Sequence, residues 1–336
     1  MMNQFNKISV SRLINYNKIK HNRLVDLINL QYCGSNANNI NLYFDLSSLC
    51  KSLYTSNIEV YDSFELVSSI INLAGFYRQF FRRYYNVECK IYLLYSPNLP
   101  AECISIYPDY NKKNFFRYNS NKIATSFIYK ALDVLSTLCP YLPDIQIYND
   151  HVEVGCMIEF LKTLQPNYIP NIVISRDPYI YQVADENTCV LVPSKSKDVN
   201  GATIDTSILV NNISSIYYYY YKNNTIIPIE AMDIPYSYLP LLMALTRCPQ
   251  RNLVSINSIN KGVNIIKNIN IEDIKSDKQL EIRYYLCDLK QQLESYKMSP
   301  SRVIINADII NLYNREEILN INNKYFANYP LEIESL

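Results

Sequence analysis

The chain has 336 residues, of which 49% are hydrophobic and 19% are charged, and its formal net charge is +1 at pH 7. These values exclude a disordered chain and predict a globular protein with either one large α/β domain or two ordinary domains. Because the charges nearly balance, any contact with nucleic acid would need a local basic patch.

The sequence contains no recognisable targeting, membrane or zinc pattern. Nine cysteines are scattered without a CxxC pair, and only two histidines accompany them, so a closed zinc site and a secreted disulfide framework are not expected. No apolar run reaches the roughly 18 residues of a membrane span, and the first residues lack the apolar core of a signal peptide. We expect a cytoplasmic protein. The abundance of Asn, Ile, Tyr and Lys indicates an AT-rich genome and fits a bacteriophage, in which case the location would be the host cytoplasm or the virion.

Strands and helices alternate through the first two thirds of the chain. Apolar runs predict strands at 40–45, 89–96, 144–150, 171–177, 188–194 and 215–222, of which the last is a candidate antiparallel strand. Helical spacing predicts helices at 23–30, 63–85, 123–138 and 150–164, and a helical pattern from residue 235 to the end with a break at 298–302. This order predicts an α/β fold, a mostly parallel central sheet with helices on both faces.

Four polar residues stand at predicted strand ends: Asp45, Ser96, Asp150 and Asp177. In a parallel sheet, ligands bind beyond the carboxyl ends of the strands, so these residues predict the position of a site. Asp150 is the expected N-cap of the following helix, which places Gly155 and Cys156 on its first exposed turn.

Five segments resemble those of the 5′-nuclease family, which comprises flap endonucleases and phage 5′–3′ exonucleases and is a branch of the PIN-like fold. They are LYFDLSSL at 42–49, IYPDYNKKN at 106–114, VEVGCMIEFL at 152–161, VISRDPYIYQV at 173–183 and the long segment 241–269. Their shared order and spacing cover about residues 41–269. The resemblance implies a PIN-like domain at 39–234, preceded by an extension at 1–38. It also implies a helical C-terminal subdomain at 235–336 that contains a degenerate helix–hairpin–helix-type element.

The departures from the family pattern concern chemistry. The family hydrolyses phosphodiesters with two divalent ions held by a cluster of carboxylates. The resemblance carries three of these over, Asp45, Glu153 and Asp177. The other acidic positions fall on Gly155, Cys156, Tyr179 and, within one residue or so, Ser96, Thr246 and Pro249. Neutral side chains cannot offset the charge of two close Mg²⁺ ions.

The DNA-gripping element is also altered. The family hairpin uses glycines so that backbone N–H groups can approach phosphates. Here only Gly262 remains, with Ser255, Asn257 and Ser258 in the other places. Asn tolerates left-handed backbone angles, so a turn is expected at this point. The resemblance implies Lys261 and Lys267 as phosphate contacts.

Two further basic groups are candidate nucleic-acid contacts. Arg78, Arg82 and Arg83 share one predicted helix, and the arch-like segment that follows contains Lys112, Lys113, Arg117 and Lys122. In this fold both groups are expected to flank the same cleft. Interleaved aromatic residues could stack on bases. The alternatives are a solvated helix face or a protein-facing surface.

The sequence therefore predicts a catalytically degenerate member of the 5′-nuclease family that binds nucleic acid or a partner protein, or serves as a structural component. No cofactor is expected, except that Asp45, Glu153 and Asp177 could hold at most one weakly bound Mg²⁺ or Mn²⁺. The alternative is a residual metal-dependent 5′–3′ exonuclease or flap endonuclease.

Overall fold

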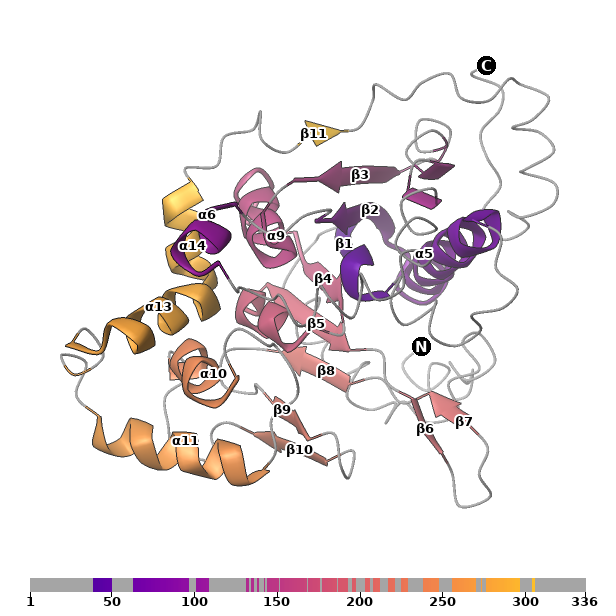
Figure 1. Ribbon diagram of the computed structural model, residues 1–336. Coiled ribbons are helices and arrows are strands. Elements are labelled where there is room, and N and C mark those ends of the chain that lie inside the picture. The colour runs from indigo at the N-terminus through magenta and orange to yellow at the C-terminus, as the bar shows by residue number, and fades with distance from the viewer. Residues whose placement is uncertain are drawn as a thin grey trace.

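The computed structural model describes residues 39–49, 63–96, 101–108, most of 131–192, and then 195–197, 203–205, 208–211, 217–220, 225–228, 238–247, 256–269, 273, 276–296 and 304–305. A sheet lies between helices, and further helices from the second half of the chain lie beside it (Figure 1). The expected extension at 1–38, the helix at 23–30, most of the arch-like segment and the boundary at 234–235 lie outside the described residues. No helix in the described ranges is both long and apolar enough to cross a bilayer.

The central sheet has seven strands in the order β11-β3-β2-β1-β4-β5-β8. Its five inner strands are parallel, which confirms the expected α/β fold. They are β3 (Ile145–Asn149), β2 (Glu88–Tyr95), β1 (Asn39–Asp45), β4 (Asn171–Ile174) and β5 (Thr188–Val192).

The side chains on the two faces of the sheet belong to two different apolar clusters. In β1, Ile40, Leu42 and Phe44 belong to one apolar cluster, whereas Tyr43 belongs to a second cluster on the opposite face. Successive side chains of a strand point to opposite faces. Asp45 therefore lies on the face of Tyr43.

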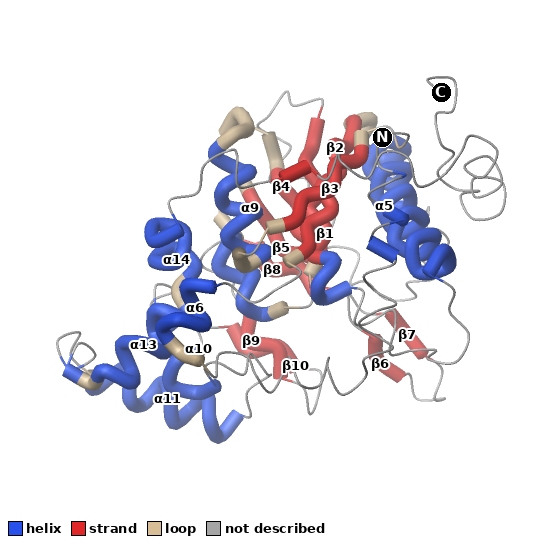
Figure 2. The backbone as a smooth tube through the Cα atoms, turned by 45° about the horizontal axis from the view of Figure 1, so that its top comes forward, coloured by secondary structure: helices blue, strands red, loops and turns tan. Residues whose placement is uncertain are grey.

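Helices cover both faces. The first cluster includes residues of α5 (Ser63–Tyr85), the helix expected over these same residues. The second includes residues of α9 (Val154–Thr163) and of the 3₁₀ helix η2 (Pro178–Val183). In both views α5 and α9 lie on opposite sides of the sheet (Figures 1 and 2). Asp45 is thus on the α9 side.

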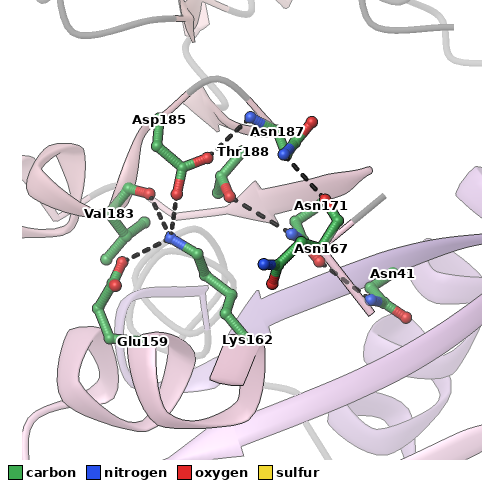
Figure 3. Close-up of polar contacts among 9 residues, drawn as sticks. All are labelled: Asn41, Glu159, Lys162, Asn167, Asn171, Val183, Asp185, Asn187 and Thr188. Atoms are coloured by element: carbon green, nitrogen blue, oxygen red, sulfur yellow. Dashed lines mark hydrogen bonds and ion pairs between the residues drawn. The ribbon is translucent and has the colours of Figure 1, made fainter. Parts of the chain in front are cut away.

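The partly buried ammonium group of Lys162 joins the end of α9 to the segment between η2 and β5 (Figure 3). Lys162 Nζ lies 2.7 Å from Glu159 Oε1 and 2.6 Å from Asp185 Oδ2, and it donates to the carbonyl oxygen of Val183 at 3.0 Å. The three acceptors match the three donors of an ammonium group. This contact fixes the C-terminal end of α9.

The later helices form a group beside the α9 face. They are α10 (Leu239–Arg247), α11 (Ile256–Asn268), α13 (Lys278–Cys287) and α14 (Leu289–Tyr296). α10 contacts α11 and α13, and α14 contacts α9. Asp288 separates α13 from α14, and its carboxylate accepts hydrogen bonds from the backbone N–H groups of Lys290 and Gln291. Such an acidic cap begins a helix.

One expectation about the second half of the chain is wrong. The chain is not helical from residue 235 onward, since β11 (Ile304–Ile305) pairs antiparallel with β3. The antiparallel edge strand at the other side is β8 (Ile208–Asn211), paired with β5. The tyrosine-rich run forms a strand, as expected: β9 (Tyr217–Tyr220) pairs antiparallel with β10 (Thr225–Pro228), in a sheet separate from the central one. A third, two-stranded sheet joins β6 (Lys195–Lys197) and β7 (Thr203–Asp205).

Candidate functional site

Asp45 lies in a buried hydrogen-bonded network at the carboxyl end of β1. Its Oδ2 accepts from Ser175 Oγ at 2.6 Å, and its Oδ1 accepts from the backbone N–H of Ser48 at 3.2 Å. Burial is the largest influence on this carboxyl and raises its pKa to about 6; the Ser175 hydrogen bond lowers the pKa, and the charge of Asp177 raises it.

The other two retained carboxylates lie at helix N-termini, and Asp177 caps its helix with its side chain, whereas Glu153 makes no side-chain cap hydrogen bond. Asp177 is the N-cap of η2, and its Oδ1 accepts from the backbone N–H of Tyr179 at 3.0 Å. Glu153 is the N-cap residue of α9 and is only 8% exposed. Asp150 was expected in that role; the helix instead begins at Val154, because Glu153 still has an extended backbone with φ −63° and ψ 141°.

Gly155 and Cys156 are buried, so the expectation of an exposed first turn of α9 is wrong. The cause is the corner between α13 and α14, residues 285–292, which covers them and is here called the α13–α14 corner. A Cβ atom on Gly155 would lie 2.6 Å from Leu289 Cδ1. The Cys156 thiol lies 3.9 Å from the carbonyl oxygen of Leu289 and 4.0 Å from Gln292 Oε1, and it donates toward these acceptors.

Tyr179, which falls on another acidic position of the family, contacts the same corner. Its hydroxyl donates to the carbonyl oxygen of Leu286 at 3.1 Å and accepts from Gln292 Nε2 at 2.5 Å. Three positions where the family has carboxylates are therefore joined by one neutral, buried contact surface.

The residues at this edge do not fit a two-metal centre. Among the described residues, no group of three or more His, Cys, Asp or Glu side chains is placed to hold a metal ion. Hard divalent cations need several oxygen ligands converging on one point. Here both carboxylate oxygens of Asp45 and Oδ1 of Asp177 accept hydrogen bonds from protein donors.

The arginines of α5 do not lie at this edge, contrary to expectation. Arg78 pairs with Asp144 at 2.6 Å, and Arg82 pairs with Glu88 at 3.1 Å. Glu88 is paired with Asn39, the first residue of β1, whereas Asp45 is the last. Seven residues of strand separate the two edges by roughly 20 Å. Arg78 and Arg82 therefore cannot flank a cleft at Asp45.

The remaining basic candidates stay predictions. Lys112, Lys113, Arg117 and Lys122 lie outside the described residues, as does the side chain of Arg83. Lys261 and Lys267 both lie in α11, Lys267 with an exposed side chain in its last turn. Asn257 and Ser258 lie within the first turn of α11, not in the expected hairpin turn.

Sequence reasoning missed Ser175, Leu289 and Gln292. Ser175 occupies the position of a serine in the family motif, so its place beside Asp177 was a usable signal. No sequence signal identified Leu289 and Gln292, because the residues that they contact lie more than 100 residues earlier in the chain.

The fold is that of known nucleases. One solved structure, bacteriophage T5 5′-exonuclease with bound zinc, matches with a TM-score of 0.54 at 14% identity, covering 76% of this chain and 92% of that one. A second, the bacteriophage T5 flap endonuclease in a pseudo-enzyme–product complex with DNA and metal ions, matches with a TM-score of 0.51 at 14% identity, covering 76% of this chain and 91% of that one. This chain has the fold of the 5′-nuclease core. No family model and no curated protein matches the sequence.

Proposed function

We propose that this chain is a non-catalytic protein with a 5′-nuclease fold, which acts as a nucleic-acid-binding or structural component. The observation that carries the proposal is the state of the carboxylates at the carboxyl edge of the sheet. Only three remain of the family's set, and Asp45 and Asp177 are engaged by hydroxyl and backbone donors. Two-metal hydrolysis needs each ion to clamp the attacking or leaving oxygen, which this set does not support.

Binding of nucleic acid does not require those carboxylates. The segment after α6 (Ala101–Ile106) combines Lys112, Lys113 and Arg117 with several aromatic residues. Basic side chains that neutralise phosphates and aromatic rings that stack on bases suit a single strand. The matching phage T5 flap endonuclease structure contains DNA and metal ions. We propose DNA as a ligand of this chain, but not the metal ions.

A cleavage and binding assay on a 5′-flap DNA with Mg²⁺ or Mn²⁺, at low and moderate salt, tests the proposal. The same assay on the Asp45→Ala/Asp177→Ala variant serves as the control. We expect no cleavage by either protein. Cleavage by the parent and not by the variant would overturn the proposal in favour of a residual metal-dependent nuclease.

The binding part of the assay separates nucleic-acid binding from a structural role. Salt-sensitive binding that is lost in Lys112→Ala/Lys113→Ala/Arg117→Ala, and kept in Arg82→Ala, would support nucleic-acid binding through the arch-like segment. Arg82 is a matched control because it lies at the opposite edge of the sheet, paired with Glu88. Absence of binding in the parent would leave the structural role.

A further inference from the structure

The α13–α14 corner is held over the α9 end of the sheet by neutral contacts. Gln292 is 0% exposed, and its Nε2 donates to the carbonyl oxygen of Leu286 at 2.9 Å as well as to Tyr179. Gln182 of η2 binds the corner's main chain on both sides of Asp288, since its Nε2 donates to the carbonyl oxygen of Cys287 at 2.9 Å and its Oε1 accepts from the N–H of Leu289 at 3.3 Å. The corner is thus fixed to η2 by side chains and main chain together.

The corner also leaves little room for the carboxylates that the family has at the positions it covers. At residue 155, a Cβ atom would lie 2.6 Å from Leu289 Cδ1, so the Leu289 side chain would have to move. At residue 156, a carboxylate would face two oxygen acceptors, the Leu289 carbonyl and Gln292 Oε1. Placing a buried charge against these oxygen acceptors is strongly unfavourable. At residue 179, a shorter side chain would leave the Gln292 carboxamide without the hydroxyl that it binds.

The same corner reaches the base of the arch-like segment. Cys103 of α6 and Leu286 of α13 form a small buried cluster, 0% and 1% exposed. In both views α6 lies beside α14 (Figures 1 and 2). One segment therefore covers the former acidic positions and contacts the helix from which the arch-like segment begins.

We propose that the α13–α14 corner is an internal plug, which keeps divalent cations and phosphodiesters away from residues 155, 156 and 179 independently of the missing carboxylates. This inference rests on the proposed non-catalytic function and deepens it. The positions that are acidic in the family now form a contact surface within the chain. The residues on the two sides of this surface are complementary in shape and hydrogen bonding.

Thiol labelling tests the plug in the full-length native protein. Cys156 lies under the corner, whereas Cys189 is equally buried, at 0% exposure, in the cluster on the α5 face. The readout is the ratio of the N-ethylmaleimide labelling rates of Cys156 and Cys189, measured by peptide mass spectrometry, with the urea-unfolded chain giving the unprotected ratio. Because both rates rise together on global unfolding, the ratio reports only local opening at the corner.

Leu289→Ala opens the corner, and Leu135→Ala is the matched control, since Leu135 is 0% exposed on the α5 face. We expect Leu289→Ala to raise the Cys156:Cys189 ratio about tenfold or more, and Leu135→Ala to leave it unchanged. An unchanged ratio in Leu289→Ala, or a native Cys156 that is labelled as fast as in urea, would overturn the plug.

A second measurement uses Mn²⁺ alone as the probe. The variant Gly155→Asp/Cys156→Asp/Tyr179→Asp is prepared with and without Leu289→Ala, and the Mn²⁺-induced shift in Tm is measured. A shift that requires Leu289→Ala supports the plug, whereas an equal shift with Leu289 in place refutes it. Neither result depends on cleavage by the native chain, so failure of the plug and failure of the proposed function are separate outcomes.

Discussion

The hydrogen bond between Tyr179 and Gln292 allows the docking of the α13–α14 corner to be measured as a coupling free energy. Tyr179→Phe removes a hydroxyl that binds both the Leu286 carbonyl and Gln292 Nε2. The Leu286 carbonyl keeps a second donor, Gln292 Nε2 at 2.9 Å, which limits the loss. We expect Tyr179→Phe to lower the free energy of unfolding by about 1–2 kcal/mol, within the range for one buried group that loses its partner.

Gln292→Leu should cost more, roughly 2–4 kcal/mol, because the buried Tyr179 hydroxyl and the carbonyls of Leu286 and Tyr285 all lose a donor or acceptor at once. If the two side chains interact as described, the double variant should be more stable than the sum of the single losses by about 1 kcal/mol. The sequence contains no Trp, so urea unfolding followed by far-ultraviolet circular dichroism is the suitable assay.

Tyr43→Phe is the matched control for this cycle. Tyr43 is as buried as Tyr179, yet its hydroxyl has no hydrogen-bond partner among the described residues. Removing an unsatisfied buried hydroxyl should leave stability unchanged or raise it by about 1 kcal/mol. A coupling energy near zero for Tyr179 and Gln292, or an equal loss for Tyr43→Phe and Tyr179→Phe, would refute the docked corner.

Three further predictions follow from buried groups. Burial raises the pKa of Asp45 from 3.8 to about 6, so at intermediate pH the folded chain holds a proton that the unfolded chain has released. The contribution of Asp45 to stability should be fully present below about pH 4 and fall by roughly 3 kcal/mol as the pH rises through about 6. Asp45→Asn should flatten this dependence in urea unfolding at several pH values, and an unaltered profile would contradict the assignment. Lys162→Met should cost roughly 2–4 kcal/mol, because it leaves partly buried carboxylates without their cation, whereas the exposed Lys278→Met should change stability by less than about 0.5 kcal/mol; equal effects would argue against the contact in Figure 3. Gly155→Ala should cost about 1–3 kcal/mol by overpacking against Leu289, and Leu289→Ala should relieve that cost; strictly additive thermal shifts would show that the two residues do not touch.

Local sequence patterns determined the elements of the α/β core. The apolar run that ends at Asp45 gave β1, and the helical spacing of residues 63–85 gave α5 with both bounds correct. The polar residues at the predicted strand ends also identified the carboxyl edge of the sheet as the place of a site. The reason is that the carboxyl ends of parallel strands lie at the same edge of a sheet. The resemblance to the 5′-nuclease family added the fold, and structural similarity to the phage T5 enzyme bears it out.

Partners that are distant in the sequence decided the remainder. Arg78 forms an ion pair with Asp144, 66 residues further along the chain, and its position on a helix said nothing about which edge of the sheet it would reach. β11 joined the sheet through a pair with β3, although only two of its residues take part. Two residues carry no usable strand periodicity.

The candidate site shows most clearly which features depend on local sequence and which depend on tertiary packing. The sequence by itself determined that Gly155, Cys156 and Tyr179 replace carboxylates, because residue identity at a motif position is a local fact. Only the tertiary structure decided that these residues are buried, since the burial comes from Leu289 and Gln292, 133 residues or so further along the chain. Periodicity reports which face of a helix is apolar, but the segment that covers this face is chosen by packing across the whole fold.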